Sequence, residues 1–325
     1  MAQKSKGVLP PGLIVRTGKF VWTTMWRLMM SKLAPADPEG AYTRPQSQFR
    51  DRVSLDQAAA NRYVLIGGMS CPWAHRTLVT RALKGLTQAV PVITVFPDGD
   101  QGIWTFEKPY EGCQTLPDFY TAMQPGYSGR ATVPVLWDSQ TRKIINNESA
   151  EIIEILNEAF NPLAEPPDLD LYPEALRSQI DRWNDQIYRS VNNGVYRCGF
   201  AQTQAAYETA CTELFDTLDQ ADAALANQRY LCGEALTLAD VRLFTTLIRF
   251  DVAYYGLFKC NRRRIQDYAH LSRYLRDLYQ LPGVAATCDI AAVKRDYYGN
   301  LFPLNPGGII PLGPELDLEK SQTPT

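Results

Sequence analysis

Residues 63–75 read YVLIGGMSCPWAH, a continuous apolar run that ends in glycines and leads directly into a Cys-Pro pair. An uninterrupted apolar segment such as 63–67 is typical of a strand buried on both faces. Pro72 then has the position of a first helical residue, and apolar side chains recur at helical spacing over 78–86. The stretch therefore predicts a strand, a tight connection and a helix that begins just after Cys71.

The position of Cys71 gives its thiol a distinctive electrostatic setting. Unpaired N–H groups and the helix dipole stabilise an anion at a helix N-terminus, so we expect a lowered pKa and a reactive thiolate. Ala74 stands where a dithiol oxidoreductase has its second cysteine. A mixed disulfide at Cys71 therefore needs an external thiol or a distant cysteine to resolve it, which favours glutathione over a thioredoxin-like cycle. We interpret the other six cysteines as inert.

Further elements complete a small α/β unit around this strand and helix. Apolar runs predict a second strand over 90–96 and two more over 132–137 and 143–145. A helix is predicted over 149–160. The intervening stretch 98–129 is rich in Gly, Pro and aromatic residues, and we interpret it as a long loop. This order of elements predicts an α/β domain with a mixed sheet.

Proline content and periodicity divide the 325 residues into five segments. Residues 1–60 form an N-terminal extension, and 61–160 form the α/β domain. A proline-rich linker follows over 161–173, and 174–290 form a helical domain. Residues 291–325 form an irregular, Gly- and Pro-rich tail.

Composition excludes several classes of protein. A hydrophobic share of 45% with 21% charged residues is ordinary for a soluble globular chain, and a net charge of −2 gives no reason to expect nucleic acid as a partner. His75 and His270 are the only histidines, and neither HExxH nor a Cys-x-x-Cys pair occurs, so no metal site is expected. Seven scattered cysteines fit a reduced, cytoplasmic chain better than a disulfide framework.

The N-terminal residues form the longest apolar segment of the chain. Four cations interrupt the stretch 13–33, so no integral membrane segment and no secretory signal are expected. Residues 1–36 contain no acid, and their aromatic residues are interspersed with basic ones. A plain extension, a transit segment and a membrane-surface helix all remain open.

Two motifs of the α/β unit suit a γ-glutamyl peptide. A proline opening a central strand, as at Pro134, is awkward unless the bond is cis, and it would leave the Val133 backbone free for a peptide-like ligand. At the next predicted helix, Ser149 and the first amides suit a carboxylate, and Glu148 suits an ammonium group. The alternatives are an ordinary edge-strand proline and simple helix capping.

These motifs together resemble a known family. The Cys-Pro-x-x helix, Val-Pro strand and Glu-Ser helix resemble the thioredoxin-fold half of cysteine-type glutathione transferases, and Thr237-Leu-Ala-Asp240 resembles the capping box of their helical half. A narrower set resembles the glutathionyl-hydroquinone reductases, or Xi-class transferases: CPWAHR (71–76), RALKGL (81–86), WTF (104–106), GR (129–130), VPVLWD (133–138), NNES (146–149), GVY (194–196), GFA (199–201), FKCN (258–261) and NPGGIIP (305–311). The resemblance covers residues 46–314. It implies an α/β plus all-α architecture, with an N-terminal thioredoxin-like domain and a C-terminal helical bundle.

The resemblance also implies roles for individual residues. Cys71 would be the nucleophile, and Tyr196 and Tyr297 would face the aromatic ligand and act as general acids. The residues expected to hold glutathione are Trp104, Arg130, Val133, Glu148 and Ser149. Each has an ordinary alternative, such as a packing aromatic, a solvated surface charge or a buried tyrosine with a satisfied hydroxyl. Glutathione is expected as a cosubstrate, with no permanently bound cofactor.

The implied reaction is the reductive cleavage of a glutathionyl-hydroquinone through a Cys71–glutathione disulfide. One alternative is an omega-like thiol transferase or dehydroascorbate reductase, and another is a non-catalytic assembly module. The chain departs from the expected pattern at Asp296, where the resemblance leads us to expect histidine. The expected partners are aromatic glutathione conjugates and a second copy in a homodimer.

Overall fold

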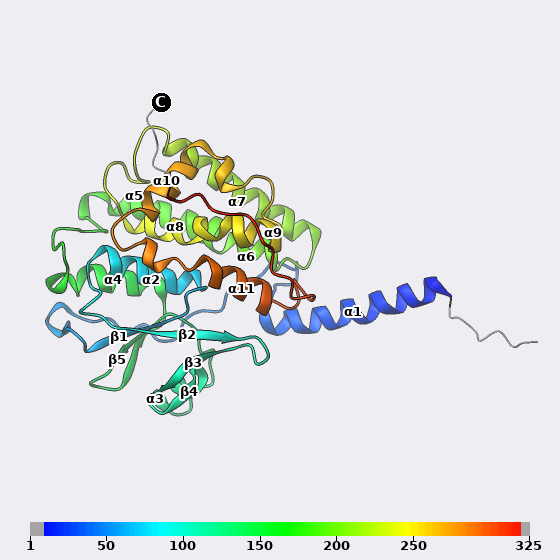
Figure 1. Ribbon diagram of the computed structural model, residues 1–325, viewed down its shortest axis with the longest axis horizontal. Helices are drawn as coiled ribbons and strands as arrows, with labels where there is room; N and C mark the ends of the chain where they lie inside the picture. The colour runs from blue at the N-terminus through cyan, green and yellow to red at the C-terminus, as the bar shows by residue number, and fades with distance from the viewer. Residues whose placement is uncertain (1–9, 320–325) are drawn as a thin grey trace, which may run out of the picture.

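The computed structural model describes residues 10–319, and Figure 1 shows a sheet-containing half beside a larger helical half. The remaining parts of the predicted extension and tail, residues 1–9 and 320–325, lie outside the described residues. The strands are β1 Tyr63–Gly67, β2 Val92–Asp98, β3 Ile103–Tyr110, β4 Cys113–Thr115, β5 Val135–Asp138 and β6 Lys143–Asn146. The α-helices are α1 Pro11–Leu33, α2 Pro72–Leu83, α3 Leu116–Met123, α4 Ser149–Glu158, α5 Arg177–Ile187, α6 Gly194–Gly199, α7 Gln204–Ala224, α8 Leu238–Arg249, α9 Tyr255–Leu257, α10 Ala269–Tyr279 and α11 Ile290–Asn300.

The six strands form one mixed sheet in the order β4-β3-β2-β1-β5-β6. β1 pairs in parallel with β2, whereas its pairing with β5 and the outer pairings are antiparallel. β1 is buried along its whole length, as its sequence predicts, and its side chains alternate between two cores. Ile66 packs in the cluster that includes Phe119 of α3, and Leu65 packs in the cluster that includes Leu156 of α4. The predicted mixed sheet is confirmed.

The prediction of a long loop over 98–129 is wrong. That stretch contains β3, β4 and α3. β3 carries exposed charges at Glu107 and Lys108, so it has no continuous apolar run. α3 has only eight residues, and its start is fixed by Thr115, whose side chain accepts from Asp118 N at 3.2 Å. Elements this short give a weak periodic signal.

The predicted irregular tail begins too early, because α11 occupies residues 290–300. Asp289 caps this helix by accepting from Ala292 N at 2.8 Å, and Val293 and Tyr297 are buried against the helical half. Residues 301–319 contain no helix or strand, in agreement with their Gly and Pro content.

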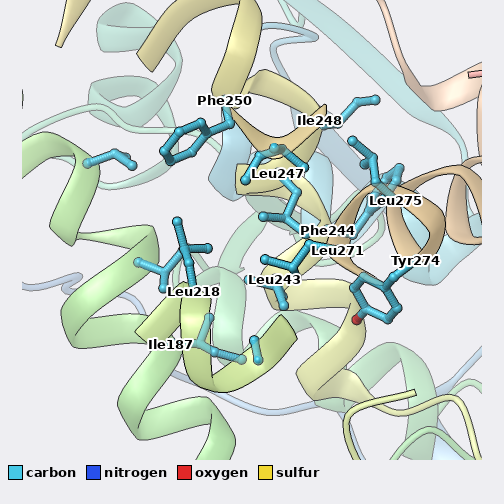
Figure 2. Packing of buried hydrophobic residues seen from close by; sticks show 14 of the residues in the cluster. Ile187, Leu218, Leu243, Phe244, Leu247, Ile248, Phe250, Leu271, Tyr274 and Leu275 are labelled. Atoms are coloured by element: carbon cyan, nitrogen blue, oxygen red, sulfur yellow. The ribbon is translucent and has the colours of Figure 1, made fainter. Parts of the chain in front are cut away.

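The helical half has its own apolar core around α8 (Figure 2), where side chains of α5, α7, α8 and α10 meet. α8 begins at the predicted capping box, in which the backbone N and the hydroxyl of Thr237 both donate to Asp240 Oδ2, at 2.8 and 2.9 Å. α8 also contacts α2, so this core supports the helix that follows Cys71.

The N-terminal part of α1 projects from the body of the molecule (Figure 1), whereas Met30 near its C-terminal end is buried. Within residues 10–319, no helix combines the length and the apolar character needed to span a membrane.

Candidate active site

The turn between β1 and α2 places Cys71 at the helix start. Cys71 is the N-cap of α2 and Pro72 its first residue, as predicted. Cys71 N donates to Gly68 O at 3.1 Å, and His75 N donates to Cys71 O at 2.9 Å, so the connection is tight. Cys71 is partly exposed as a residue, and its thiol lies 3.8 Å from the Val133 carbonyl oxygen. The peptide bond between Val133 and Pro134 is cis.

The predicted lowering of the Cys71 pKa is wrong. Burial raises the pKa of the thiol above its ordinary value. The backbone amides of Trp73 and Ala74 lower it, as do the positive charges of Arg249 and Arg44, but together they lower it less than burial raises it. The helix-start effect expected from the sequence is therefore present and is outweighed.

Arg249, at the end of α8, holds the backbone that precedes Cys71. Its buried guanidinium donates to Met69 O at 2.9 Å and to Ser70 O at 3.0 Å. It also donates to His75 Nδ1 at 2.7 Å, which leaves Nε2 of that ring to donate to Thr287. Burial and the Arg249 charge hold the pKa of His75 well below its usual range, so the ring stays neutral. Arg249 was not predicted from the sequence, although it and Arg242 are the two arginines of an otherwise mostly apolar helix, which was a usable signal.

Three tyrosines form a hydrogen-bonded chain beside Cys71. The hydroxyls of Tyr196 and Tyr297 lie 2.6 Å apart, and those of Tyr297 and Tyr254 lie 2.9 Å apart. Burial raises the pKa of all three phenols, that of Tyr254 to about 12, so they remain protonated at neutral pH. Tyr254, which the sequence analysis missed, lies in the π-helical turn Phe250–Tyr254, an irregularity frequent at functional sites.

A cavity of about 730 Å³ opens above Cys71. Its walls come from the end of α1, from residues 42–48 and 127–133, and from the tail at 301–304. Trp73 lies in the wall with its ring stacked on Tyr196 at 6.4 Å. The Arg44 guanidinium lies 3.8 Å from the centre of the Trp73 ring, which fixes a positive charge at the cavity.

The residues predicted to bind glutathione divide into two groups. Trp104, Arg130 and Val133 line the cavity with Cys71, and the Trp104 ring packs so closely on Gly68 that a Cβ there would lie 2.3 Å from it. Glu148 and Ser149 are not among the lining residues.

Instead, the cavity wall at this point is formed by Ser47 and Asn147. Ser47 donates to Glu148 Oε2 at 3.0 Å, and the buried Ser149 hydroxyl accepts from Arg76 Nη1 at 3.3 Å. Tyr297 likewise reaches the cavity only through Tyr196.

Comparison with known proteins identifies the family. Residues 70–159 match the N-terminal domain of glutathione S-transferases, and residues 204–277 match the C-terminal domain. Glutathionyl-hydroquinone reductase PcpF of Sphingobium chlorophenolicum is 46% identical over 283 residues, covering 85% of this chain and 90% of the relative. The chain belongs to the glutathione transferase family.

Solved transferases share the fold over most of the chain. The glutathione S-transferase Xi from Phanerochaete chrysosporium superposes with a TM-score of 0.83 at 43% identity, covering 86% of this chain and 94% of that one. The glutathione-bound structure of YqjG from Escherichia coli superposes with a TM-score of 0.79 at 43% identity, covering 84% and 94%. The predicted resemblance to glutathionyl-hydroquinone reductases and the predicted transferase fold are confirmed.

In this glutathione transferase, Asp296 lies close to the nucleophile's loop. Its carboxylate is an acceptor for the Ser70 side chain and pairs with Arg295 at 3.1 Å. Burial raises the pKa of Asp296, and the hydrogen bond from Ser70 opposes that effect. At the position where the resemblance leads us to expect histidine, an acidic side chain therefore lies beside the residue that precedes Cys71.

Proposed function

We propose that this protein reduces glutathionyl-hydroquinones to hydroquinones and releases oxidised glutathione. The observation that carries the proposal is that the Cys71 thiol and the Tyr196 phenol, which is hydrogen-bonded to Tyr297, lie on the walls of the same cavity. Thiol attack and carbon protonation are the two events that the reaction needs. The identity to PcpF supports the choice of substrate.

The first half-reaction breaks a carbon–sulfur bond. The Cys71 thiolate attacks the sulfur of the conjugate, forms a disulfide with glutathione, and leaves the electron pair on the aromatic carbon. Tyr196 donates the proton that this carbon takes up, and its hydrogen bond with Tyr297 links it to the phenol chain. In the second half-reaction a free glutathione thiolate attacks the mixed disulfide, which releases oxidised glutathione and restores Cys71.

Glutathione is the cosubstrate, and no permanently bound cofactor is required by this chemistry. We propose that Val133 pairs with its peptide backbone, and that Trp104 and Arg130 contact it across the cavity. Since Ser47 stands between the cavity and Glu148, the γ-glutamyl ammonium would replace the Ser47 hydroxyl on that carboxylate. Ser149 does not line the cavity, so it would affect glutathione binding indirectly, through the backbone amides at the start of α4.

The test compares three proteins on a glutathionyl-hydroquinone: wild type, Cys71→Ala and Cys288→Ala. Cys288 is the matched control because it is also a free, partly exposed cysteine. We expect loss of hydroquinone formation and of the glutathione adduct mass in Cys71→Ala alone. Retained activity in Cys71→Ala would overturn the mechanism. Turnover of dehydroascorbate or mixed disulfides without turnover of the conjugate would instead identify an omega-like thiol transferase, and a chain that never forms the adduct would be a non-catalytic module.

Two further properties belong to the proposal. The seven cysteines are all free, which supports a reducing compartment, and we place the enzyme in the cytoplasm. We also propose a homodimer, since transferase-like chains pair by two-fold symmetry. Light scattering at micromolar concentration tests the dimer, and a monomeric mass would exclude it.

A further inference from the structure

α1 concentrates the exposed apolar surface of the molecule. Of the sixteen large hydrophobic side chains that are exposed within residues 10–319, nine lie on this helix. Phe20 and Leu28 are 73% and 67% exposed. A soluble protein rarely exposes so contiguous an apolar surface unless the surface binds something.

The helix separates its cations from part of this apolar surface, whereas Phe20, at i+4 from Arg16, lies on the side of the cations. Arg16, Lys19 and Arg27 follow the spacing i, i+3, i+11, and so share one side of the helix. Another side carries Ile14, Val21, Met25 and Leu28, at i, i+7, i+11 and i+14. The helix therefore presents a basic side and an apolar side along a length of about 35 Å.

Charge distinguishes this segment from the rest of the chain. Residues 1–36 contain six of the 33 Lys and Arg residues and none of the 35 Asp and Glu residues, so the remainder has 27 basic against 35 acidic residues. The acidic remainder is repelled by an anionic surface, whereas the projecting helix is attracted to one (Figure 1).

We propose that α1 is an interfacial helix that docks this protein on an anionic lipid bilayer. An amphipathic helix with basic and aromatic side chains lies in the plane of the headgroups, with its apolar side in the acyl region and its cations on the anionic headgroups. A protein partner would be expected to supply acidic side chains at fixed positions, whereas cations on one side of a projecting helix with no acidic residue suit a continuous anionic surface.

Docking would bring the cavity close to the lipid. Met30 and Leu33, at the end of α1, line the cavity, and Trp22 lies 6.4 Å from Phe302 of the adjacent tail. The helix thus connects the bilayer to the wall of the active site. The docking itself does not depend on the proposed reaction.

Vesicle sedimentation of the full-length protein tests the proposal. We expect binding to vesicles that contain phosphatidylglycerol, weaker binding to phosphatidylcholine alone, and partial release by high salt. The variant Arg16→Gln/Lys19→Gln/Arg27→Gln removes three cations and should weaken partitioning on the order of 100-fold. The matched control is Lys108→Gln/Lys143→Gln/Arg182→Gln, which removes three exposed cations of the body and should bind as wild type does.

An apolar variant, Val21→Ser/Met25→Ser, should also lose binding to the vesicles. No sedimentation with any vesicle, or equal losses in the α1 and body variants, would overturn the proposal. The proposal would also be overturned if the protein did not bind vesicles and light scattering showed that Val21→Ser/Met25→Ser dissociates an oligomer. The apolar side would then be an interface between copies of the chain.

Discussion

Replacing Tyr196 by phenylalanine should separate the two chemical events at the site. The ring and its stacking on Trp73 remain, and the hydroxyl that lies 2.6 Å from the Tyr297 hydroxyl is lost. Positioned general acids typically accelerate a step 10²- to 10⁴-fold. We therefore expect kcat for hydroquinone formation to fall by roughly 10²-fold or more. Exchange of Cys71 with a small glutathione mixed disulfide protonates no carbon, so it should stay within about threefold of wild type.

The neighbouring phenols should show smaller effects, graded by their distance from the cavity. Tyr297→Phe removes one partner from Tyr196 and one from Tyr254, and each lost hydrogen bond is worth about 1 kcal/mol. That corresponds to a loss on the order of fivefold to tenfold in hydroquinone formation. Tyr254 lies outside the cavity lining, where its hydroxyl bonds to Tyr297 and its ring lies 6.0 Å from that of Tyr196, so the loss in Tyr254→Phe should be smaller still.

The assay separates hydroquinone from its conjugate by chromatography after single and multiple turnovers. Disulfide exchange is followed in parallel on the same protein preparations. Near wild-type hydroquinone formation by Tyr196→Phe would refute the general-acid role. An equal loss in both reactions would mean that the hydroxyl stabilises the fold or the reactive state of the Cys71 thiol. That result would also refute the general-acid role.

Three further outcomes are expected. Arg249→Lys cannot reproduce the guanidinium contacts to the two carbonyls before Cys71, so kcat/KM should fall about tenfold with a lower melting temperature; unchanged kinetics would contradict its positioning role. Asp240→Ala strands four donors that the fully buried carboxylate accepts, so thermal unfolding should show a loss of about 3–5 kcal/mol, and Asp240→Asn should lose less. Because burial raises the pKa of Cys71 and only the thiolate reacts, alkylation of this thiol should accelerate as pH rises, with a midpoint above that of a free cysteine, and further still in Arg249→Gln; a midpoint near neutral pH would contradict this.

The local elements that carry strong signals could be predicted from the sequence. A buried strand such as β1 can be predicted because every residue is apolar. The start of α8 can be predicted because Thr237 and Asp240 satisfy each other's backbone donors. β3, β4 and α3 were not predicted because they are short and half-exposed. α11 was not predicted because the Gly- and Pro-rich sequence that follows it outweighed the capping signal at Asp289.

The site could be predicted only as far as its chemistry-bearing residues. Cys71, Trp104 and Tyr196 do share one cavity. Arg249 and Tyr254 lie at and just after the end of α8. The spacing of residues within this segment does not show what it packs against, so the proximity of these two residues to Cys71 depends on tertiary packing. The direction of the thiol pKa was also beyond reach, because it depends on how much protein surrounds the sulfur.

Ala74 has a consequence for how the enzyme responds to its surroundings. Among the described residues that line the cavity, Cys71 is the one cysteine, so no second thiol of the cavity wall can resolve a disulfide formed there. In the proposed cycle a thiol from solution resolves the mixed disulfide, so the rate at which Cys71 is regenerated is first order in free glutathione. A cell whose glutathione is depleted would hold the enzyme as the adduct, in which the sulfur is protected from irreversible oxidation. Activity would return as glutathione is replenished, without any repair of the protein.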